Sequence, residues 1–418
     1  MKNRILVIGA GAAGLMAAGQ AAEAGAEVVL LEKMKRPGRK ICISGKGRCN
    51  ITNIADKTDF IDHFGRNGRF LRQAFNRFFS PDLMRFFEEC GLGLVKERGG
   101  RVFPASGKAP DVLKAFQHWL DGLPVSIRPE SRVEELLLED GRVKGVICNG
   151  NPVNGEAVIL TTGGKSYPAT GSTGDGYRLA QSAGHTIVPF RPALVPVETA
   201  GNLARRLAGL HLRNVRVRLF IGNKKKQDAF GELLFMRYGL SGPVILTLSS
   251  MIVDALRAGK KVGLILDLKP ALDVQKLDAR LLRDFTGRSR EQMDSVLRGL
   301  MAKEMVSVCL AETGIAPDRL AGEVRAVERK RLRHWLKNIS FDVTGYRGFK
   351  EAIVTAGGVD LRQVDPRSME SKCCPGLYLA GELLDLQADT GGYNLQAAFS
   401  TGWLAGLSAA ERVMSVVK

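Results

Sequence analysis

Apolar runs alternate with alanine- and glycine-rich stretches at the start of the chain. The run Ile5–Ile8 precedes an alanine-rich stretch at 12–24, and a second apolar run occupies 27–31. Alanine favours helices, and Gly25 is a common helix stop. The pattern predicts a strand, a helix and a second strand, the unit from which parallel sheets are built.

Three glycines follow the first predicted strand with the spacing G-x-G-x-x-G. Gly9 permits a tight turn, Gly11 lets the backbone approach a pyrophosphate, and Gly14 lets the helix pack closely on the strand. The free N–H groups and positive dipole at the helix N-terminus attract phosphates. Glu32 ends the second strand and can accept both hydroxyls of an adenosine ribose. These residues predict a dinucleotide site without choosing between FAD and NAD.

Three further glycine-rich segments occur along the chain: segment A at 38–53 (GRKICISGKGRCNITN), segment B at 161–177 (TTGGKSYPATGSTGDGY) and segment C at 376–406. Segment B follows a predicted hairpin, 133–138 with 143–148, and a predicted strand at 157–160. A small-residue turn after such a strand suits a second contact with a bound dinucleotide.

Segment C favours FAD over NAD. It contains a predicted strand at 377–380, and Gly391-Gly392 opens a predicted helix that runs to about Val413. The N-terminus of that helix can face the N1–C2=O edge of a flavin ring and stabilise the negative charge of the reduced form. FAD is extended and needs contacts far apart in the sequence, whereas NAD binding to a simple Rossmann domain would leave segment C unexplained.

Composition narrows the function only slightly. The 418 residues are 45% hydrophobic, enough for two or three domains, and the net charge is +18. This charge attracts polyanions such as nucleic acid, although a generally basic surface with one dinucleotide ligand is the simpler interpretation. Seven cysteines, an odd count, favour reduced thiols in a cytoplasmic protein. There is no CxxC or HExxH and no long apolar segment, so neither a metal site nor a membrane span is predicted.

The chain resembles the BaiN/RdsA-type bacterial flavoproteins, often described as aminoacetone-oxidase-like or NAD(P)/FAD-dependent oxidoreductases. The resemblance rests on GAGAAGL, GRKICISGKGRCNITN, GGKSYPATGSTGDGY, FMRYGLSGPVIL, TAGGVDL and TGGYNLQAAFSTG, which together cover nearly the whole chain. It implies an α/β fold, with FAD held by a two-dinucleotide, Rossmann-like domain that carries a β-rich insert and a small helical insert. The chain departs from the family pattern at Cys42 and at LQAD, residues 386–389, a segment expected near the flavin ring.

The expected domains are an FAD domain in two parts, 1–190 and 346–418, a β-rich insert at 191–270 with a return strand at about 337–345, and a helical insert at 271–336. Within the helical insert, RAVERKRLRHWLKN is the most basic stretch. Its simplest interpretation is a solvated helix face, with Leu332, Trp335 and Leu336 pointing inward.

The glycine-rich segments and the resemblance together define an expected set of cofactor contacts. The residues expected to contact FAD are Gly9, Gly11, Ala12, Ala13, Gly14, Glu32, Lys33, Arg39, Lys40, Ser44, Gly45, Gly47, Arg48, Cys49, Asn50, Val133, Thr162, Gly163, Gly164, Gly357, Gly358, Gly381, Glu382, Asp385, Gly391, Gly392, Tyr393, Asn394 and Leu395. Lys46 and Arg48 are also candidates for holding oxygens of the flavin or the substrate.

The favoured hypothesis is an NAD(P)H-driven reductase of a C=C bond conjugated to a carbonyl. The resemblance points this way, because some members look like enone reductases and others like ribosomal-RNA dihydrouridine synthases. The expected partner is therefore a small-molecule substrate or ribosomal RNA. A second G-x-G-x-x-G is absent, so NADH or NADPH is expected to dock transiently. Cys49, Tyr393 and Tyr167 are the candidate proton donors, although packing is the simpler role for Cys49, and ring stacking or capping is the simpler role for Tyr393.

Three alternatives stay open. An amine oxidase would pass electrons to O₂. A thiol–disulfide reductase would use Cys42 and Cys49. Nearby lysines and arginines would activate the two thiols by lowering the thiol pKa. A non-catalytic RNA-binding flavoprotein would use basic side chains of the inserts. The basic residues of that kind are Arg213, Arg216, Arg218, Lys224, Lys225 and Lys226.

Overall fold

The computed structural model describes residues 3–417, which divide into two compact units. Unit 1 contains residues 3–192 and 349–417, and unit 2 contains the intervening Ala193–Gly348. The two parts of unit 1 come from the two ends of the chain.

A five-stranded parallel sheet lies within unit 1. Its strands, in spatial order, are β19 (Leu377–Leu379), β10 (Ala157–Leu160), β1 (Arg4–Ile8), β2 (Glu27–Leu31) and β6 (Val125–Arg128). All four pairings are parallel. The segments that follow β1, β10 and β19 therefore emerge at the same edge, where ligands bind in folds of this kind. The predicted α/β, Rossmann-like fold is confirmed.

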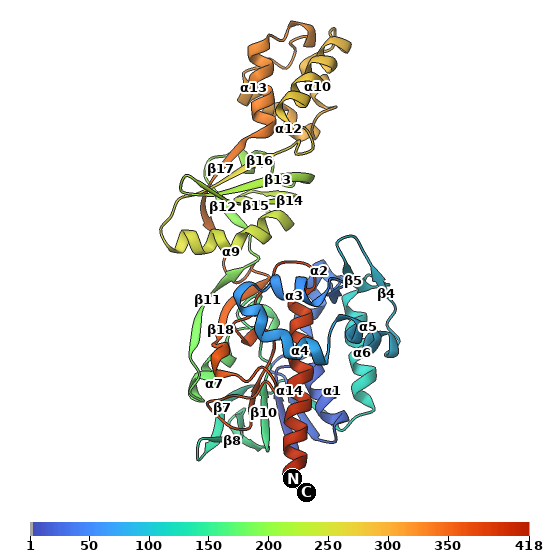
Figure 1. Cartoon of the computed structure of the whole chain (residues 1–418), viewed down its shortest axis with the longest axis vertical. Helices are drawn as coiled ribbons and strands as arrows, with labels where there is room; N and C mark the ends of the chain where they lie inside the picture. Colours follow the sequence, from blue (N-terminus) through green and yellow to red (C-terminus); the bar gives the residue numbers. More distant parts are fainter. Residues whose placement is uncertain (1–2, 418) are drawn as a thin grey trace. The chain divides into compact units, whose positions relative to one another are not determined.

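Two helices pack against each other in unit 1 through small residues. α1 (Ala12–Glu23) lies beside α14 (Tyr393–Val417), the long red helix of Figure 1. A Cβ atom at Gly402 would lie 2.3 Å from the carbonyl oxygen of Ala13, and one at Gly406 would lie 2.3 Å from that of Ala17. Glycine at these two positions lets the helix backbones approach closely, which fixes the start of α14 relative to the start of α1.

Unit 1 also contains smaller sheets and further helices. Its smaller sheets contain β7 (Val133–Glu139), β8 (Arg142–Cys148) and β9 (Asn151–Asn154); β3 (Thr52–Asn53), β5 (Arg101–Pro104) and β4 (Leu94–Lys96); and β11 (Ile187–Ala193) with β18 (Val354–Val359). Its other helices are α2 (Arg39–Gly47), α3 (Lys57–Asp62), η1 (Gly65–Leu71), α4 (Arg72–Arg77), α5 (Ser80–Glu89), α6 (Ala109–Asp121), η2 (Pro168–Thr170), α7 (Asp175–Ser182), η4 (Leu361–Gln363) and η5 (Gly381–Leu383). The antiparallel pairing of β7 with β8 confirms the predicted hairpin.

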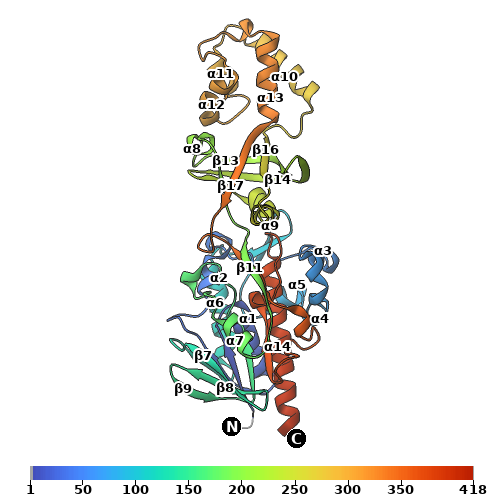
Figure 2. The ribbon, with the colours of Figure 1, turned by 90° about the vertical axis from the view of Figure 1, so that its left-hand side faces the viewer.

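Unit 2 contains a closed β-barrel and a group of helices (Figure 2). The barrel strands, in order, are β12 (Val197–Thr199), β15 (Gly239–Ser241), β14 (Lys224–Met236), β13 (His211–Ile221), β16 (Val262–Asp267) and β17 (Ile339–Tyr346). The helices are α8 (Leu203–Arg206), α9 (Pro243–Arg257), α10 (Val274–Gly287), α11 (Met293–Leu297), α12 (Lys303–Thr313), η3 (Ala321–Glu323) and α13 (Ala326–Lys337). Barrel and helices share one hydrophobic core.

The basic helix α13 turns its apolar side inward. Leu332 and Leu336 are fully buried, as expected from the sequence. Beside this apolar face, the partly buried Arg329 and Arg333 both pair with Asp278 of α10, at 3.2 and 3.0 Å. These two positive charges of α13 are therefore paired with a carboxylate inside unit 2.

Candidate functional site

Three side chains from segments A, B and C form one hydrogen-bonded cluster in unit 1. Lys40 Nζ donates to Glu382 Oε2 and to Ser166 Oγ, both at 2.6 Å. Ser166 Oγ donates to Glu382 Oε1 at 2.9 Å, and the N–H of Thr355 donates to the same oxygen at 2.7 Å. Segments that are far apart in the chain therefore converge on the carboxylate of Glu382.

The first glycine turn leaves open space at one position. A Cβ atom at Gly11 would meet no atom within 4 Å, whereas one at Gly14 would lie 1.8 Å from the carbonyl oxygen of Gly9. Gly14 is thus required for close packing of α1, while Gly11 leaves room beside the first-turn N–H groups of Ala12 and Ala13. First-turn N–H groups have no acceptor within their own helix, so they are available to a ligand.

Glu32 and Lys33 lie at the end of β2. The buried Glu32 carboxylate accepts the N–H groups of Ala10 and Met34, both at 2.8 Å. Lys33 forms an ion pair with Asp175 at 2.7 Å. Glu32 is held rigidly beside the first glycine turn. Lys33 links the end of β2 to segment B through its ion pair with Asp175.

The glycine-rich segment A begins as a helix. α2 spans Arg39–Gly47 but loses helical geometry at Ser44, Gly45 and Lys46. The helix forms because its first five residues contain no glycine, and it breaks where Gly45 adopts a φ of +56°. Beyond the break, Asn50 Oδ1 is buried and accepts no hydrogen bond from any described residue.

Arg48 is held by protein groups. Its guanidinium forms an ion pair with Glu97 at 2.5 Å and lies 4.3 Å from the ring centroid of Phe103. Lys46 lies at the helix break with a φ of +57°, and Arg39 is exposed at the start of α2.

Cys49 is fully buried, and burial raises the pKa of its thiol to about 12. Burial also raises the pKa of the Cys42 thiol. All seven cysteines are free. The expectation that nearby basic residues activate these thiols is therefore wrong, because loss of solvation dominates the pKa of both thiols and no basic side chain lowers either one. A dithiol mechanism finds no support in this geometry.

Segment B follows β10 and passes the first glycine turn. Thr162 Oγ1 is buried and bonds to no described residue. Gly163 adopts a φ of +71°, and a Cβ atom at Gly164 would lie 2.4 Å from Thr355 Oγ1. Tyr167 is half-buried in the left-handed region, with a φ of +52°, and burial raises the pKa of its hydroxyl.

Segment C packs against segment A where α14 begins. The side chain of Asn53 donates to the carbonyl of Gly391 at 3.0 Å, and a Cβ atom at Gly392 would lie 2.4 Å from the carbonyl oxygen of Thr52. Tyr393 is buried, and burial, followed by nearby carboxylates, raises the pKa of its hydroxyl. The start of α14 is therefore placed directly against segment A.

The remaining predicted contacts are distributed around this centre. Gly381 lies against the first turn of α1, where its Cβ atom would be 2.8 Å from that of Ala13. Gly357 and Gly358 lie buried in β18 and pack closely against neighbouring backbone, which by itself requires glycine there. Val133 is buried at the start of β7.

The sequence did not single out His63, Asn67 or Asp389 as site residues; His63 and Asn67 lie beside segment C, and Asp389 is part of it. Asn67 Nδ2 donates to the carbonyl of Asp385 at 2.7 Å and to its carboxylate at 3.0 Å. His63 Nδ1 lies 3.2 Å from Asp389 Oδ2. The departure from the family pattern at 386–389 could have directed attention to these residues, because His63 contacts Asp389 and Asn67 contacts the neighbouring Asp385.

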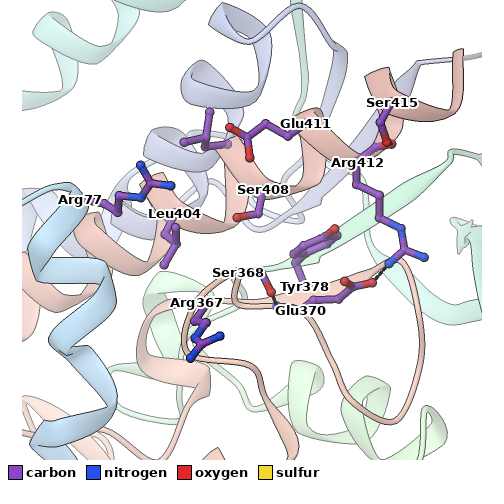
Figure 3. Close-up of a pocket in the computed structure, with 11 residues that line it drawn as sticks. Arg77, Arg367, Ser368, Glu370, Tyr378, Leu404, Ser408, Glu411, Arg412 and Ser415 are labelled. Carbon is purple, nitrogen blue, oxygen red and sulfur yellow. Dashed lines mark hydrogen bonds and ion pairs between the residues drawn. The ribbon is translucent and has the colours of Figure 1, made fainter. Parts of the chain in front are cut away.

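One cavity of about 580 Å³ lies along the C-terminal half of α14 (Figure 3). It is lined by Arg77, Arg367, Ser368, Glu370, Tyr378, Leu404, Leu407, Ser408, Glu411, Arg412 and Ser415. Arg412 and Glu370 form an ion pair across it. It shares no residue with the predicted cofactor contacts, so it is separate from the site at the glycine-rich segments.

The residues present fit an extended polar cofactor. Asn50 Oδ1, Thr162 Oγ1 and Gln387 Oε1 are buried without a described partner, one in each of segments A, B and C. Burial of a polar atom without a hydrogen bond is costly, so a ligand that supplies the missing bonds would stabilise the site. The open space at Gly11 and the free first-turn N–H groups of α1 add a place for phosphates.

Comparison with known proteins identifies the family. The family model described as HI0933-like protein Rossmann domain matches residues 3–408. The chain is a member of this HI0933-like family. It is 34% identical to a 3-dehydro-bile acid delta(4,6)-reductase of Clostridium scindens, over 98% of this chain and all of that protein. It is 30% identical to a ribosomal RNA dihydrouridine synthase of Escherichia coli, over 95% of this chain and 96% of that protein.

Solved structures share the fold of the HI0933-like chain. A flavocytochrome c3 fumarate reductase superposes with a TM-score of 0.50 at 17% identity, over 99% of this chain and 78% of that one. FrdA of the Escherichia coli quinol fumarate reductase superposes with a TM-score of 0.51 at 18% identity, over 99% and 71%. The predicted resemblance is confirmed, and the protein is an oxidoreductase of an FAD-dependent family.

Residues 3–417 contain no cluster of three or more histidine, cysteine, aspartate or glutamate side chains arranged for a metal ion. None of the helices described there has the length and hydrophobicity needed to cross a bilayer.

Proposed function

We propose that the protein is an FAD-dependent reductase of a C=C bond conjugated to a carbonyl group. The convergence of segments A, B and C on Glu382 carries the proposal. The names of two relatives support the reaction class. A 3-dehydro bile acid with delta(4,6) unsaturation and a uracil ring share one feature, a C=C bond conjugated to C=O.

The chain's own residues would hold FAD along this path. Glu32 would accept hydroxyls of the adenosine ribose, and the first-turn N–H groups at Ala12 and Ala13 would bind the pyrophosphate. Asn50 and Thr162 would gain partners for their buried oxygens. The N-terminus of α14 would stabilise negative charge on the flavin ring.

The reduction needs a hydride source and a proton source. The residues named above would hold FAD, which in its reduced form would supply the hydride, and NADH or NADPH docking transiently would restore that reduced form. A side chain must supply the proton to the carbon next to the carbonyl. Tyr393 and Cys49 are poorly placed for this role, since both are buried and the pKa of each is raised.

The test is a sequence of anaerobic mixing experiments on the purified protein. A flavin spectrum is expected, followed by bleaching with NADH or NADPH. The reduced protein should then be reoxidised by a bile acid with a 3-keto-4,6-diene. Reduction of the flavin by amines but not by nicotinamides would contradict the proposal and favour an amine oxidase.

A second candidate substrate, uridine in ribosomal RNA, is favoured by the charge of unit 2. Unit 2 contains 28 lysines and arginines against 16 aspartates and glutamates, a formal charge of +12. The β13–β14 hairpin carries exposed basic side chains without a described acidic partner, namely Arg213, Arg216, Lys224 and Lys226. Phe230 is 55% exposed and lies directly opposite Arg216. Basic side chains around an exposed aromatic ring suit single-stranded nucleic acid.

Ribosomal RNA from a deletion strain tests this branch. If the substrate is uridine in RNA, mass spectrometry should show one dihydrouridine missing from the ribosomal RNA of that strain. Unchanged ribosomal RNA would eliminate the candidate and leave the small-molecule substrate.

A further inference from the structure

His63 and Asp389 form a hydrogen-bonded pair at the start of α14. His63 Nδ1 lies 3.2 Å from Asp389 Oδ2, and the two residues are 326 positions apart in the chain. The His63 ring also stacks on Tyr393, with centroids 3.8 Å apart and an interplanar angle of 23°. Tyr393 is the first residue of α14, so the pair lies next to the glycines of segment C.

Both members of the pair are held by other contacts. Phe60 packs edge-on against the Tyr393 ring, with centroids 4.8 Å apart, and this supports the ring on which His63 stacks. The side-chain amide of Asn394 donates to the carbonyl oxygens of Ala388 and Asp389, at 2.9 and 3.2 Å. The backbone that carries the carboxylate is therefore fixed to the same helix end as the imidazole.

The second ring nitrogen of His63 is available. Nε2 makes no hydrogen bond to any described residue, and the side chain is 34% exposed. Because a carboxylate at Nδ1 keeps a proton on that nitrogen, Nε2 is the ring position that can release and regain a proton.

We propose that His63 is the proton donor of the reduction and that Asp389 is its positioning residue. This inference rests on the proposed function. The hydride forms the new C–H bond at the carbon β to the carbonyl. The π electrons of the C=C bond then form the bond from the α carbon to the proton released by Nε2. His63 is left as neutral imidazole, bonded through Nδ1–H to Asp389, and takes its next proton from solvent.

The chemical test separates hydride transfer from proton transfer. His63→Gln, Asp389→Asn and the control His211→Gln are photoreduced anaerobically and mixed with the 3-keto-4,6-diene bile acid. His211 is a suitable control because it also pairs with a carboxylate, Glu232, at 3.1 Å. Loss of the proton donor should slow reoxidation by the dienone about 10²-fold or more. Reoxidation by ferricyanide, which needs no such proton, should be unchanged in all three variants.

A second readout does not depend on turnover. In ¹⁵N-histidine NMR spectra of the apoprotein, the signal that His63→Gln removes should show neutral His63 with its proton on Nδ1. Asp389→Asn should shift that signal and leave the His211 signal unchanged. A proton on Nε2 in the wild type, or a signal insensitive to Asp389→Asn, would overturn the pairing.

The outcomes distinguish the two proposals. If the wild type reduces the dienone and His63→Gln does so at the same rate, His63 is not the donor and the proposed function stands. If the reduced wild type is reoxidised by neither the dienone nor uridine-containing RNA, the proposed function fails, and the donor role fails with it. If His63→Gln also abolishes the flavin spectrum, and therefore FAD binding, the test uses Asp389→Asn instead. The same slowing of reoxidation by the dienone is expected for that variant.

Discussion

Lys40 Nζ lies 2.6 Å from Glu382 Oε2, and this ion pair joins residues that are 342 positions apart. The side chains are 26% and 20% exposed, so the pair is largely shielded from solvent. It connects segment A to segment C, and Ser166 adds segment B. Side chains as well as glycine turns therefore hold together the three segments that we propose bind the cofactor.

Breaking this pair should weaken FAD binding. Glu382→Gln and Lys40→Met should each raise the FAD Kd about 10- to 100-fold, because a lost hydrogen bond to a charged group costs about 1.5–3 kcal/mol. The double variant should cost less than the sum, since the two side chains contact each other. Titration of FAD into apoprotein measures all three values. Glu27→Gln, which breaks the Arg4–Glu27 pair on the same sheet, should leave the Kd unchanged.

Cys49 should be chemically inert in the native protein. Its folded pKa of about 12 lies above the ordinary value of 9.0, so the thiol stays protonated and unreactive near neutral pH. A disulfide reagent at pH 8 should label the exposed Cys373 and spare Cys49 until the protein unfolds. Rapid labelling of Cys49 in the folded protein would contradict this and reopen the dithiol mechanism.

The same pKa shift predicts a stability change at alkaline pH. A raised folded pKa contributes stability that is fully present below pH 9 and is lost as the pH rises toward 12. The wild type should therefore lose stability more steeply than Cys49→Ala between pH 9 and 12. Urea unfolding curves at several pH values measure the difference, and parallel curves would show that the thiol already ionises in the fold.

The sequence predicted the local elements of the site better than its side-chain pairs. The first strand, helix and glycine turn follow from hydrophobic period and residue type, which act over a few positions. Lys40–Glu382 and His63–Asp389 join residues more than 300 positions apart, and a single sequence does not specify which charges meet. The i, i+4 spacing of Gly402 and Gly406 does indicate close helix packing, so this contact could have been predicted from the sequence.

Salt dependence should reveal whether the β13–β14 hairpin binds nucleic acid. Arg213→Gln with Arg216→Gln should reduce the slope of log K against log salt by about 0.7 for each phosphate that the variant no longer neutralises, measured with labelled oligouridylate. Phe230→Ala should weaken binding by about 1–3 kcal/mol if a base stacks on the ring. The charge-matched control is Arg85→Gln with Lys114→Gln, both exposed in unit 1. Equal slopes for both double variants would remove the hairpin as the binding surface.

Close packing of α1 on α14 should be intolerant of any added side chain. Gly406→Ala places a Cβ atom 2.3 Å from the carbonyl oxygen of Ala17, which is backbone and is unable to rotate away. The helices must separate, at a cost of about 1–3 kcal/mol. Thermal unfolding should show the midpoint falling by several degrees. FAD retention should fall with it, because α14 carries segment C.

The control is Gly122→Ala, where φ is −88° and no atom lies within 4 Å, so the midpoint should stay or rise slightly. If Gly406→Ala were as stable as the control, the two helices would not be in close contact at this position.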